Sequence, residues 1–128
     1  MIKLLLVEDD ANLSYIIQGG LEDMIGGYEV IIACNGKEGL EKYRQVKPDI
    51  IVADIEMPVM DGCKAAETIR GLDRADAKTI LIFACTANAF QEDRDKAMNS
   101  GMNDFLTKPI DIHILLEKLN NEKSGERQ

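Results

Sequence analysis

The sequence has few residues of the kinds that mark thiolate metal sites, disulfide frameworks or membrane spans. Its three cysteines, Cys34, Cys63 and Cys85, lie far apart and form no C-x-x-C pair. This number and spacing predict neither a zinc site nor a disulfide framework, and reduced thiols in a cytoplasmic protein are expected. No apolar stretch approaches the ~20 residues of a membrane span, so membrane insertion is not expected. The first residues lack the layout of a secretory signal peptide.

Basic residues are also scarce relative to acidic ones. The 128 residues include 15 lysines and arginines against 23 aspartates and glutamates, which gives a formal charge of -8. A nucleic-acid surface normally carries clustered lysine and arginine, so direct binding of nucleic acid is not expected. The charge favours solubility and fits partners that are basic or carry a metal. The length predicts one domain, residues 1–120, followed by a frayed polar tail, 121–128.

Short apolar runs alternate with amphipathic stretches along the chain. The runs that predict strands are 4–7, 28–33, 50–53, 79–85 and 104–106. Apart from the run 79–85, each is followed by apolar residues at helical spacing, and Gly26-Gly27 is expected to end the first helix. The expected N-caps of the later helices are Asn35, Asp61, Asn88, with Gln91 closing a capping box, and Asp111. Five βα units predict an α/β fold: a doubly wound, flavodoxin-like parallel sheet with strand order 2-1-3-4-5.

Charged side chains follow two neighbouring strands of this sheet where each strand ends. Glu8 and Asp9 close the run 4–7, and Asp54 closes the run 50–53. Because the ends of the first and third strands lie side by side at the switch point, these three carboxylates are expected to converge. Close carboxylates raise one another's pKa. Mg²⁺ offsets this repulsion and prefers oxygen ligands, so the sequence predicts a magnesium site.

The same rim has the parts needed for phosphoryl transfer, in which catalysis is mostly positioning and charge neutralisation. Asp54 is the expected nucleophile and would form an acyl phosphate. Lys108, which follows the fifth strand, is expected to pair with a phosphoryl oxygen as a mobile point charge. Thr86, at the end of the fourth strand, could donate its hydroxyl to the same group.

Four motifs in this order and spacing resemble the response regulator receiver domain of two-component signalling, over essentially residues 2–120. The motifs are Val7-Glu8-Asp9, the segment from Asp54 to Gly62 that contains Pro58, Thr86-Ala87 and Lys108-Pro109. The resemblance implies that Asp54 is the phosphoacceptor and that Thr86 and Lys108 hold the phosphoryl group. It implies that Asp9 binds Mg²⁺ directly, Glu8 mainly through water, and Glu56 through its backbone carbonyl.

The resemblance also implies a role and a partner. The chain would be a signalling phosphoacceptor that assists its own phosphorylation and dephosphorylation, and not a turnover enzyme. The donor would be a phosphohistidine on a histidine kinase or a histidine phosphotransfer domain. The segments 86–90 and 100–104 resemble receivers attached to hybrid sensor kinases, although Leu81 stands where such receivers often have proline. Because no output domain follows residue 120, the chain is expected either to act alone or to be part of something larger.

A switch is implied at Phe105, where the family carries an aromatic residue. Phosphorylation would draw Thr86 inward, and the Phe105 ring would rotate into the space behind it. A phenylalanine has no hydroxyl, so packing would have to distinguish the two states. The alternative is that Phe105 is a simple core residue. The resemblance also implies that Glu56 and Asn88 influence how fast the acyl phosphate hydrolyses, and Glu56 could also pair with a lysine.

Several alternatives remain open at this stage. Asp10 fits a helix N-cap better than a metal ligand, and His113, the only histidine, fits a surface or packing role. A magnesium-dependent phosphohydrolase of the aspartyl-phosphate type shares this chemistry, but its nucleophile lies on the first strand with an acid two residues on. A pseudo-receiver that only binds partners would use the same fold.

Overall fold

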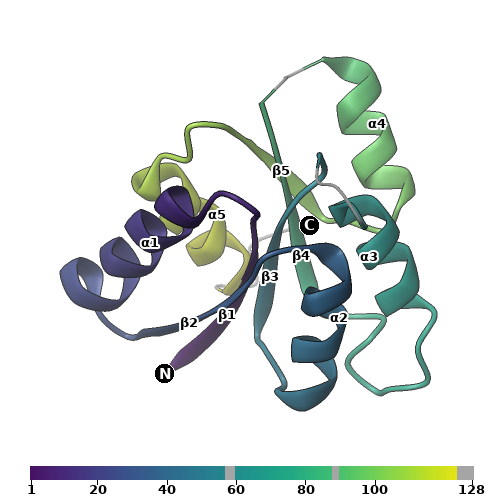
Figure 1. Ribbon diagram of the computed structural model, residues 1–128, viewed down its shortest axis with the longest axis horizontal. Coiled ribbons are helices and arrows are strands. Elements are labelled where there is room, and N and C mark those ends of the chain that lie inside the picture. Colours follow the sequence, from purple (N-terminus) through teal and green to yellow (C-terminus); the bar gives the residue numbers. More distant parts are fainter. Residues whose placement is uncertain (57–59, 88–89, 124–128) are drawn as a thin grey trace.

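Five parallel strands form one sheet in the order β2-β1-β3-β4-β5 (Figure 1). The computed structural model describes residues 1–56, 60–87 and 90–123. The strands are β1 (Ile2–Val7), β2 (Tyr28–Ala33), β3 (Ile50–Asp54), β4 (Leu81–Thr86) and β5 (Asp104–Thr107). The helices are α1 (Ala11–Gly19), the π-helical turn η1 (Gly20–Ile25), α2 (Gly36–Gln45), α3 (Gly62–Arg70), α4 (Gln91–Asn99) and α5 (Ile112–Lys123). This is the doubly wound, flavodoxin-like α/β fold predicted from the sequence.

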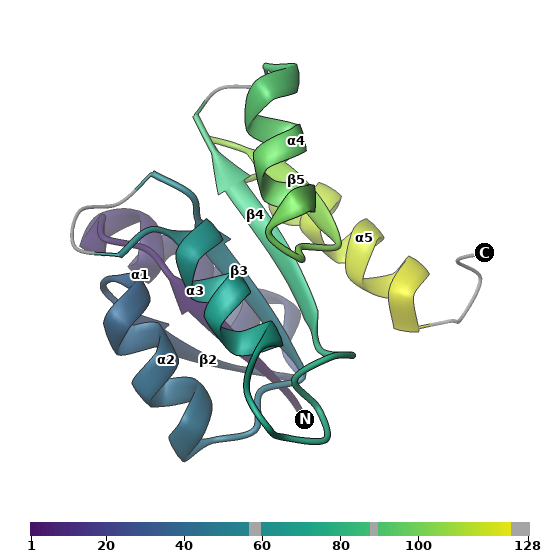
Figure 2. The ribbon, with the colours of Figure 1, turned by 90° about the vertical axis from the view of Figure 1, so that its right-hand side faces the viewer.

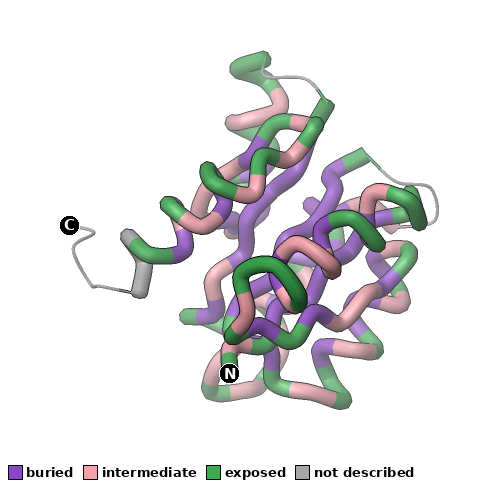
Figure 3. Tube along the Cα trace, turned by 90° about the vertical axis from the view of Figure 1, so that its left-hand side faces the viewer, coloured by how far each residue is buried: buried purple, intermediate pink, exposed green. Residues whose placement is uncertain are grey.

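Helices cover both faces of the sheet. In Figures 1 and 2, α1 and α5 lie on one face, and α2, α3 and α4 lie on the other. β1 shows why the strands are apolar throughout: Leu4 and Leu6 pack in the core beneath α1 and α5, while Leu5 and Val7 pack in the core beneath α2 and α3. Figure 3 shows the result, with buried strands at the centre and helices that alternate between buried and exposed positions. None of the described helices has both the length and the apolar character needed to cross a membrane.

The fourth strand differs from its prediction at both ends. It begins at Leu81 and continues to Thr86, whereas the apolar run predicted 79–85. The N–H groups of Thr79 and Ile80 both donate to the carbonyl of Asp76, so this stretch belongs to the turn that follows α3. Ile80 is nevertheless buried in the core, which is why it has the apolar character of a strand residue.

The observed helix ends and caps agree only in part with those predicted from the sequence. α5 runs to Lys123, past the predicted domain boundary at residue 120, and the sequence has no glycine or proline between Asp111 and Gly125. Gly26 and Gly27 do end the first helical segment, and both have positive φ. Asn88 lies outside the described residues. Phe90 is the N-cap of α4 and makes no side-chain cap bond, and Gln91 donates to Asp95 instead of closing a capping box.

The open edge of β2 is partly closed by side chains from the helical segment beside it. The carbonyl of Ala33 faces β1, where it accepts the N–H of Glu8 at 2.9 Å. Because successive residues of a strand face opposite sides, Val30 faces the open edge. Its N–H donates to the Glu22 carboxylate at 2.7 Å, and its carbonyl accepts from the Gln18 amide at 3.1 Å. Both of these backbone groups are therefore unavailable to another strand.

The double variant Gln18→Ala, Glu22→Ala is expected to self-associate through β2 as its concentration rises, and to lose about 1–3 kcal/mol of stability. Light scattering with denaturant unfolding measures both effects. The control Lys37→Ala, Glu41→Ala changes two exposed residues of α2. A double variant that stays monomeric at every concentration would show that these contacts do not guard the edge.

Candidate functional site

The adjacent carboxyl ends of β1 and β3 bring three carboxylates together. Val7 lies opposite Ala53 in the parallel pair, and the next residue of each strand path is acidic. One carboxylate oxygen from each of Glu8, Asp9 and Asp54 lies within 4.8 Å of the others. Glu8 and Asp54 are each only 2% exposed, whereas Asp9 is exposed. The structure thus brings together the three acids that the strand pattern predicted to converge.

Lys108 reaches this cluster from the end of β5 and contacts two of the acids. Its Nζ lies 2.6 Å from Asp54 Oδ2 and 3.1 Å from Glu8 Oε1. Burial lowers the pKa of Lys108, but its hydrogen bonds to Asp54 and Glu8 and their charges outweigh this and raise that pKa above its usual value. Burial, reinforced by the charge of Asp54, raises the pKa of Glu8 despite bonds from the Asp10 N–H and Lys108. One cation therefore neutralises part of a buried acidic cluster.

A second contact joins the ends of β3 and β4. The Thr86 hydroxyl, on a residue that is only 2% exposed, donates to Glu56 Oε1 at 2.9 Å. The backbone N–H of Glu56 donates to Asp54 Oδ1 at 2.8 Å. The sequence did not predict the Thr86–Glu56 contact, and the alternative of a Glu56–lysine pair is not seen among the described residues. Glu56 thus holds both the carboxylate of Asp54 and the hydroxyl of Thr86.

The donor set of the acidic cluster fits a hard divalent cation. All three groups offer carboxylate oxygens, which Mg²⁺ prefers, and the exposure of Asp9 leaves room for the water ligands that Mg²⁺ keeps. Asp10 stays outside this set. Its Oδ1 accepts the N–H groups of Asn12 and Leu13 at 3.0 and 3.2 Å, so it is the N-cap of α1, as the sequence indicated.

Phe105 lies near the surface beside the core and not within it. Its ring is partly buried and packs against the core on the side of α3 and α4. The guanidinium of Arg94 lies over the ring, with its Cζ 4.3 Å from the ring centroid. The simple interpretation of a core phenylalanine therefore describes only one side of this ring. Of the other predicted residues, His113 is exposed, and Asn88 and Pro58 lie outside the described residues.

The first residue of α3 lies close to the end of β3, beside the acidic cluster. A Cβ on Gly62, the first residue of α3, would lie 2.5 Å from the carbonyl oxygen of Asp54. The N-cap Asp61 accepts the N–H of Lys64 at 2.9 Å. The Asp61-Gly62 pair thus combines a helix cap with a glycine, whose lack of a Cβ permits this approach. Both residues were visible in the sequence as a helix start.

Comparison with known sequences identifies a family, with relatives that are either as short as this chain or much longer. The family description "response regulator receiver domain" matches residues 4–120. The chemotaxis protein CheY of Thermotoga maritima is 39% identical over 123 residues, covering 94% of this chain and 97% of that protein. The hybrid signal transduction histidine kinase I of Dictyostelium discoideum is 34% identical over 125 residues. That match covers 94% of this chain but only 7% of the kinase.

Solved structures agree with this similarity. The chemotaxis protein CheY4 of Vibrio cholerae has a TM-score of 0.86 at 30% identity, covering 94% of this chain and 98% of that one. The receiver domain of a sensor histidine kinase from Pseudomonas aeruginosa, with magnesium coordinated in its active-site cleft, has a TM-score of 0.82 at 32% identity and covers 94% and 95%. The receiver domain of Ssk1 from Saccharomyces cerevisiae, bound to the histidine phosphotransfer protein Ypd1, has a TM-score of 0.78 at 32% identity and covers 91% and 85%.

Proposed function

The chain belongs to the response regulator receiver domain family, whose members are signalling phosphoacceptors, and we propose that it accepts its phosphoryl group on the carboxylate of Asp54. The observation that carries this proposal is the pairing of that buried carboxylate with Lys108 at 2.6 Å inside the acidic cluster. A nucleophile, a mobile cation and a set of oxygen ligands are the groups that phosphoryl transfer requires.

The proposed step moves one phosphoryl group from nitrogen to oxygen. An Asp54 carboxylate oxygen forms a bond to phosphorus while the bond between phosphorus and a histidine nitrogen of the donor breaks, and that nitrogen takes up a proton from solvent. Lys108 moves from the carboxylate to a phosphoryl oxygen, and Thr86 moves its hydroxyl from Glu56 to another. Because this chain supplies both groups, it assists its own phosphorylation. The same groups hold the acyl phosphate when water attacks it.

We also propose a magnesium site formed by Glu8, Asp9, Asp54 and the backbone carbonyl of Glu56. The cluster of carboxylate oxygens supports the first three, and the family resemblance supports the fourth. Bound there, Mg²⁺ would neutralise charge that the phosphoryl group brings. The magnesium in the related Pseudomonas aeruginosa domain lends support.

Mg²⁺ is expected to raise the melting temperature of the wild-type protein, because only the folded chain holds the three acids together. At ten times its dissociation constant the gain is about 1.4 kcal/mol. Calorimetry across a Mg²⁺ titration measures the shift. Asp9→Ala should abolish most of it, whereas Asp73→Ala, at an exposed loop position, should not. A melting temperature that ignores Mg²⁺ would contradict the site.

The proposed donor is a histidine kinase or a histidine phosphotransfer protein. The similarity to a hybrid kinase and to the receiver in the Ypd1 complex supports this choice. The chain spans only 7% of the length of that hybrid kinase. On phosphorylation, release of Thr86 from Glu56 would let Phe105 rotate inward and change the surface formed by α4, β5 and α5.

Intact mass spectrometry after incubation with Mg²⁺ and acetyl phosphate tests the function directly. One added phosphoryl group is expected. Absence of the adduct both with acetyl phosphate and with a phosphorylated histidine phosphotransfer protein would favour a pseudo-receiver. Sustained turnover of a chromogenic phosphate ester with no adduct would favour a phosphohydrolase.

A further inference from the structure

We propose that Arg94 of α4, assisted by Lys118 of α5, is a latch that holds the Phe105 ring in its surface position and so sets the balance between the two switch states. This inference rests on the proposed function, because it concerns the switch that phosphorylation would operate. Arg94 and Lys118 are positioning residues, since they act on the ring and not on the phosphoryl group.

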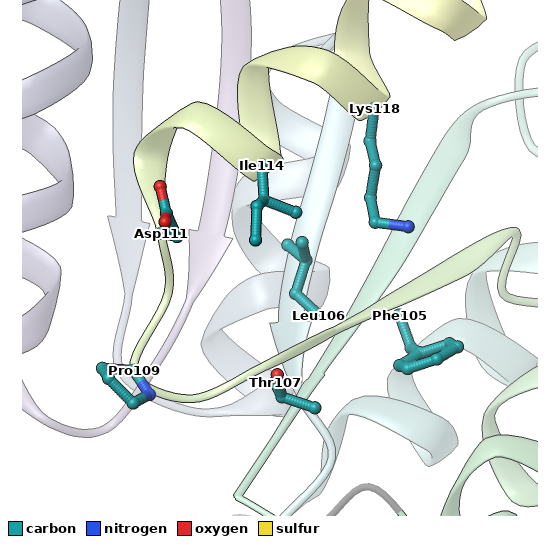
Figure 4. A pocket seen from close by; sticks show the side chains of 7 residues that line it. All are labelled: Phe105, Leu106, Thr107, Pro109, Asp111, Ile114 and Lys118. Atoms are coloured by element: carbon teal, nitrogen blue, oxygen red, sulfur yellow. The ribbon is translucent and has the colours of Figure 1, made fainter.

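The two cations approach the ring from different helices. Arg94 Cζ lies 4.3 Å from the centroid of Phe105, and Lys118 Nζ lies 5.8 Å from it. Both distances fall within the ~6 Å range of cation–π attraction. Figure 4 shows the Lys118 side chain extending from α5 towards β5, the strand that carries Phe105. The ring is therefore held between α4 and α5 by positive charge.

The surroundings of each cation keep it at the ring. Arg94 Nε is buried and has no hydrogen-bond partner among the described residues, and the guanidinium Cζ lies over the face of the Phe105 ring. Planar guanidinium stacks well on aromatic rings. Lys118 is anchored by Asp104, whose Oδ2 lies 2.9 Å from its Nζ. Arg94 makes the closer contact, so it should contribute more.

This latch would take the place of a hydrogen bond that Phe105 cannot make, because phenylalanine has no hydroxyl. A tyrosine could mark its surface position by a hydrogen bond, but a phenylalanine needs an interaction with its ring face. The contact with Arg94 exists only while the ring stays between the helices, so inward rotation breaks it. An interaction made in one state alone shifts the equilibrium by its own free energy. For an accessible cation–π contact this is a factor of about two to five.

Fluorine NMR offers a direct measure of the ring. The chain has three phenylalanines, and the other two differ sharply in environment: Phe83 is fully buried and Phe90 is 68% exposed. Protein labelled with fluorophenylalanine should give three resonances, assigned through Phe90→Leu and Phe105→Leu. Mg²⁺ with beryllofluoride, which mimics a phosphoryl group, serves as the probe. The wild-type Phe105 resonance should move on saturation.

Arg94→Met keeps an unbranched side chain but removes the charge. Its Phe105 resonance should stand partway to the activated position without beryllofluoride, and beryllofluoride should bind about two- to fivefold more tightly. Arg94→Lys should fall between Arg94→Met and wild type, and Lys118→Met should change binding less than Arg94→Met. The control Arg44→Met, at an exposed position of α2, should match wild type.

The possible outcomes distinguish the proposed latch from the proposed phosphoacceptor function. An Arg94→Met protein with an unchanged Phe83 resonance, wild-type Phe105 position and wild-type binding would overturn the latch alone. A wild-type Phe105 resonance that stays still while beryllofluoride saturates the site would overturn the aromatic switch, and the latch with it. Failure of wild type to bind beryllofluoride at all would instead count against the proposed phosphoryl site.

Discussion

Asp54→Asn is expected to give a folded protein that gains no phosphoryl group from acetyl phosphate and Mg²⁺. The amide lacks the anionic oxygen that must attack phosphorus, and it weakens the pairing that brings Lys108 to the site at 2.6 Å. The expected result is complete loss of the adduct in intact mass spectra. Asp73→Asn, at an exposed position in the loop after α3, is the matched control and should be phosphorylated like wild type.

The stability of Asp54→Asn tests the electrostatics separately. Repulsion among Glu8, Asp9 and Asp54 alone would predict that removing one charge stabilises the fold. The structure adds an opposing effect, because Lys108 loses one of its two partners and keeps Glu8 at 3.1 Å. These effects oppose each other, so the free energy of unfolding should fall by less than the ~3 kcal/mol that breaking a buried ion pair costs. An adduct in Asp54→Asn would mean another acceptor, and strong destabilisation would mean that Asp54 has an unrecognised structural role.

The convergence of the site was predictable because strand order alone determines it. Once the alternating pattern indicates a doubly wound sheet, the residues at the carboxyl ends of β1 and β3 must meet, so Glu8 and Asp54 were recognisable from their positions. The N-cap role of Asp10 was equally local, since it depends on backbone N–H groups two and three residues ahead.

Other features depended on side-chain positions that no pattern encodes. The bond between Thr86 and Glu56 joins two rim residues whose types suggested only other roles, and its distance of 2.9 Å follows from how the ends of β3 and β4 meet. Ile80 has the character of a strand residue because it is buried, although its N–H belongs to a turn. The Arg94 contact with Phe105 likewise needs the packing of α4 against β5.

Lys108→Met is expected to lower stability more than any other single change at the rim. It would leave the carboxylates of Glu8 and Asp54, each 2% exposed, without their shared cation. Breaking a buried ion pair by removing one partner costs about 3 kcal/mol, which for a domain of this size corresponds to a melting temperature lower by about 10 °C. Calorimetry in EDTA measures the loss. Lys96→Met removes a lysine whose Nζ lies 3.8 Å from Asp61 at the surface and should cost about 1 kcal/mol or less.

The cause of the loss can be isolated in two ways. Excess Mg²⁺ should restore part of the stability of Lys108→Met, because a metal at the acidic cluster supplies positive charge in place of the ammonium. In an Asp54→Asn background, Lys108→Met should cost less than in wild type, since one of the two stranded carboxylates is already gone. Equal costs in both backgrounds, with no rescue by Mg²⁺, would show that Lys108 stabilises the fold through its packing and not through the charge cluster.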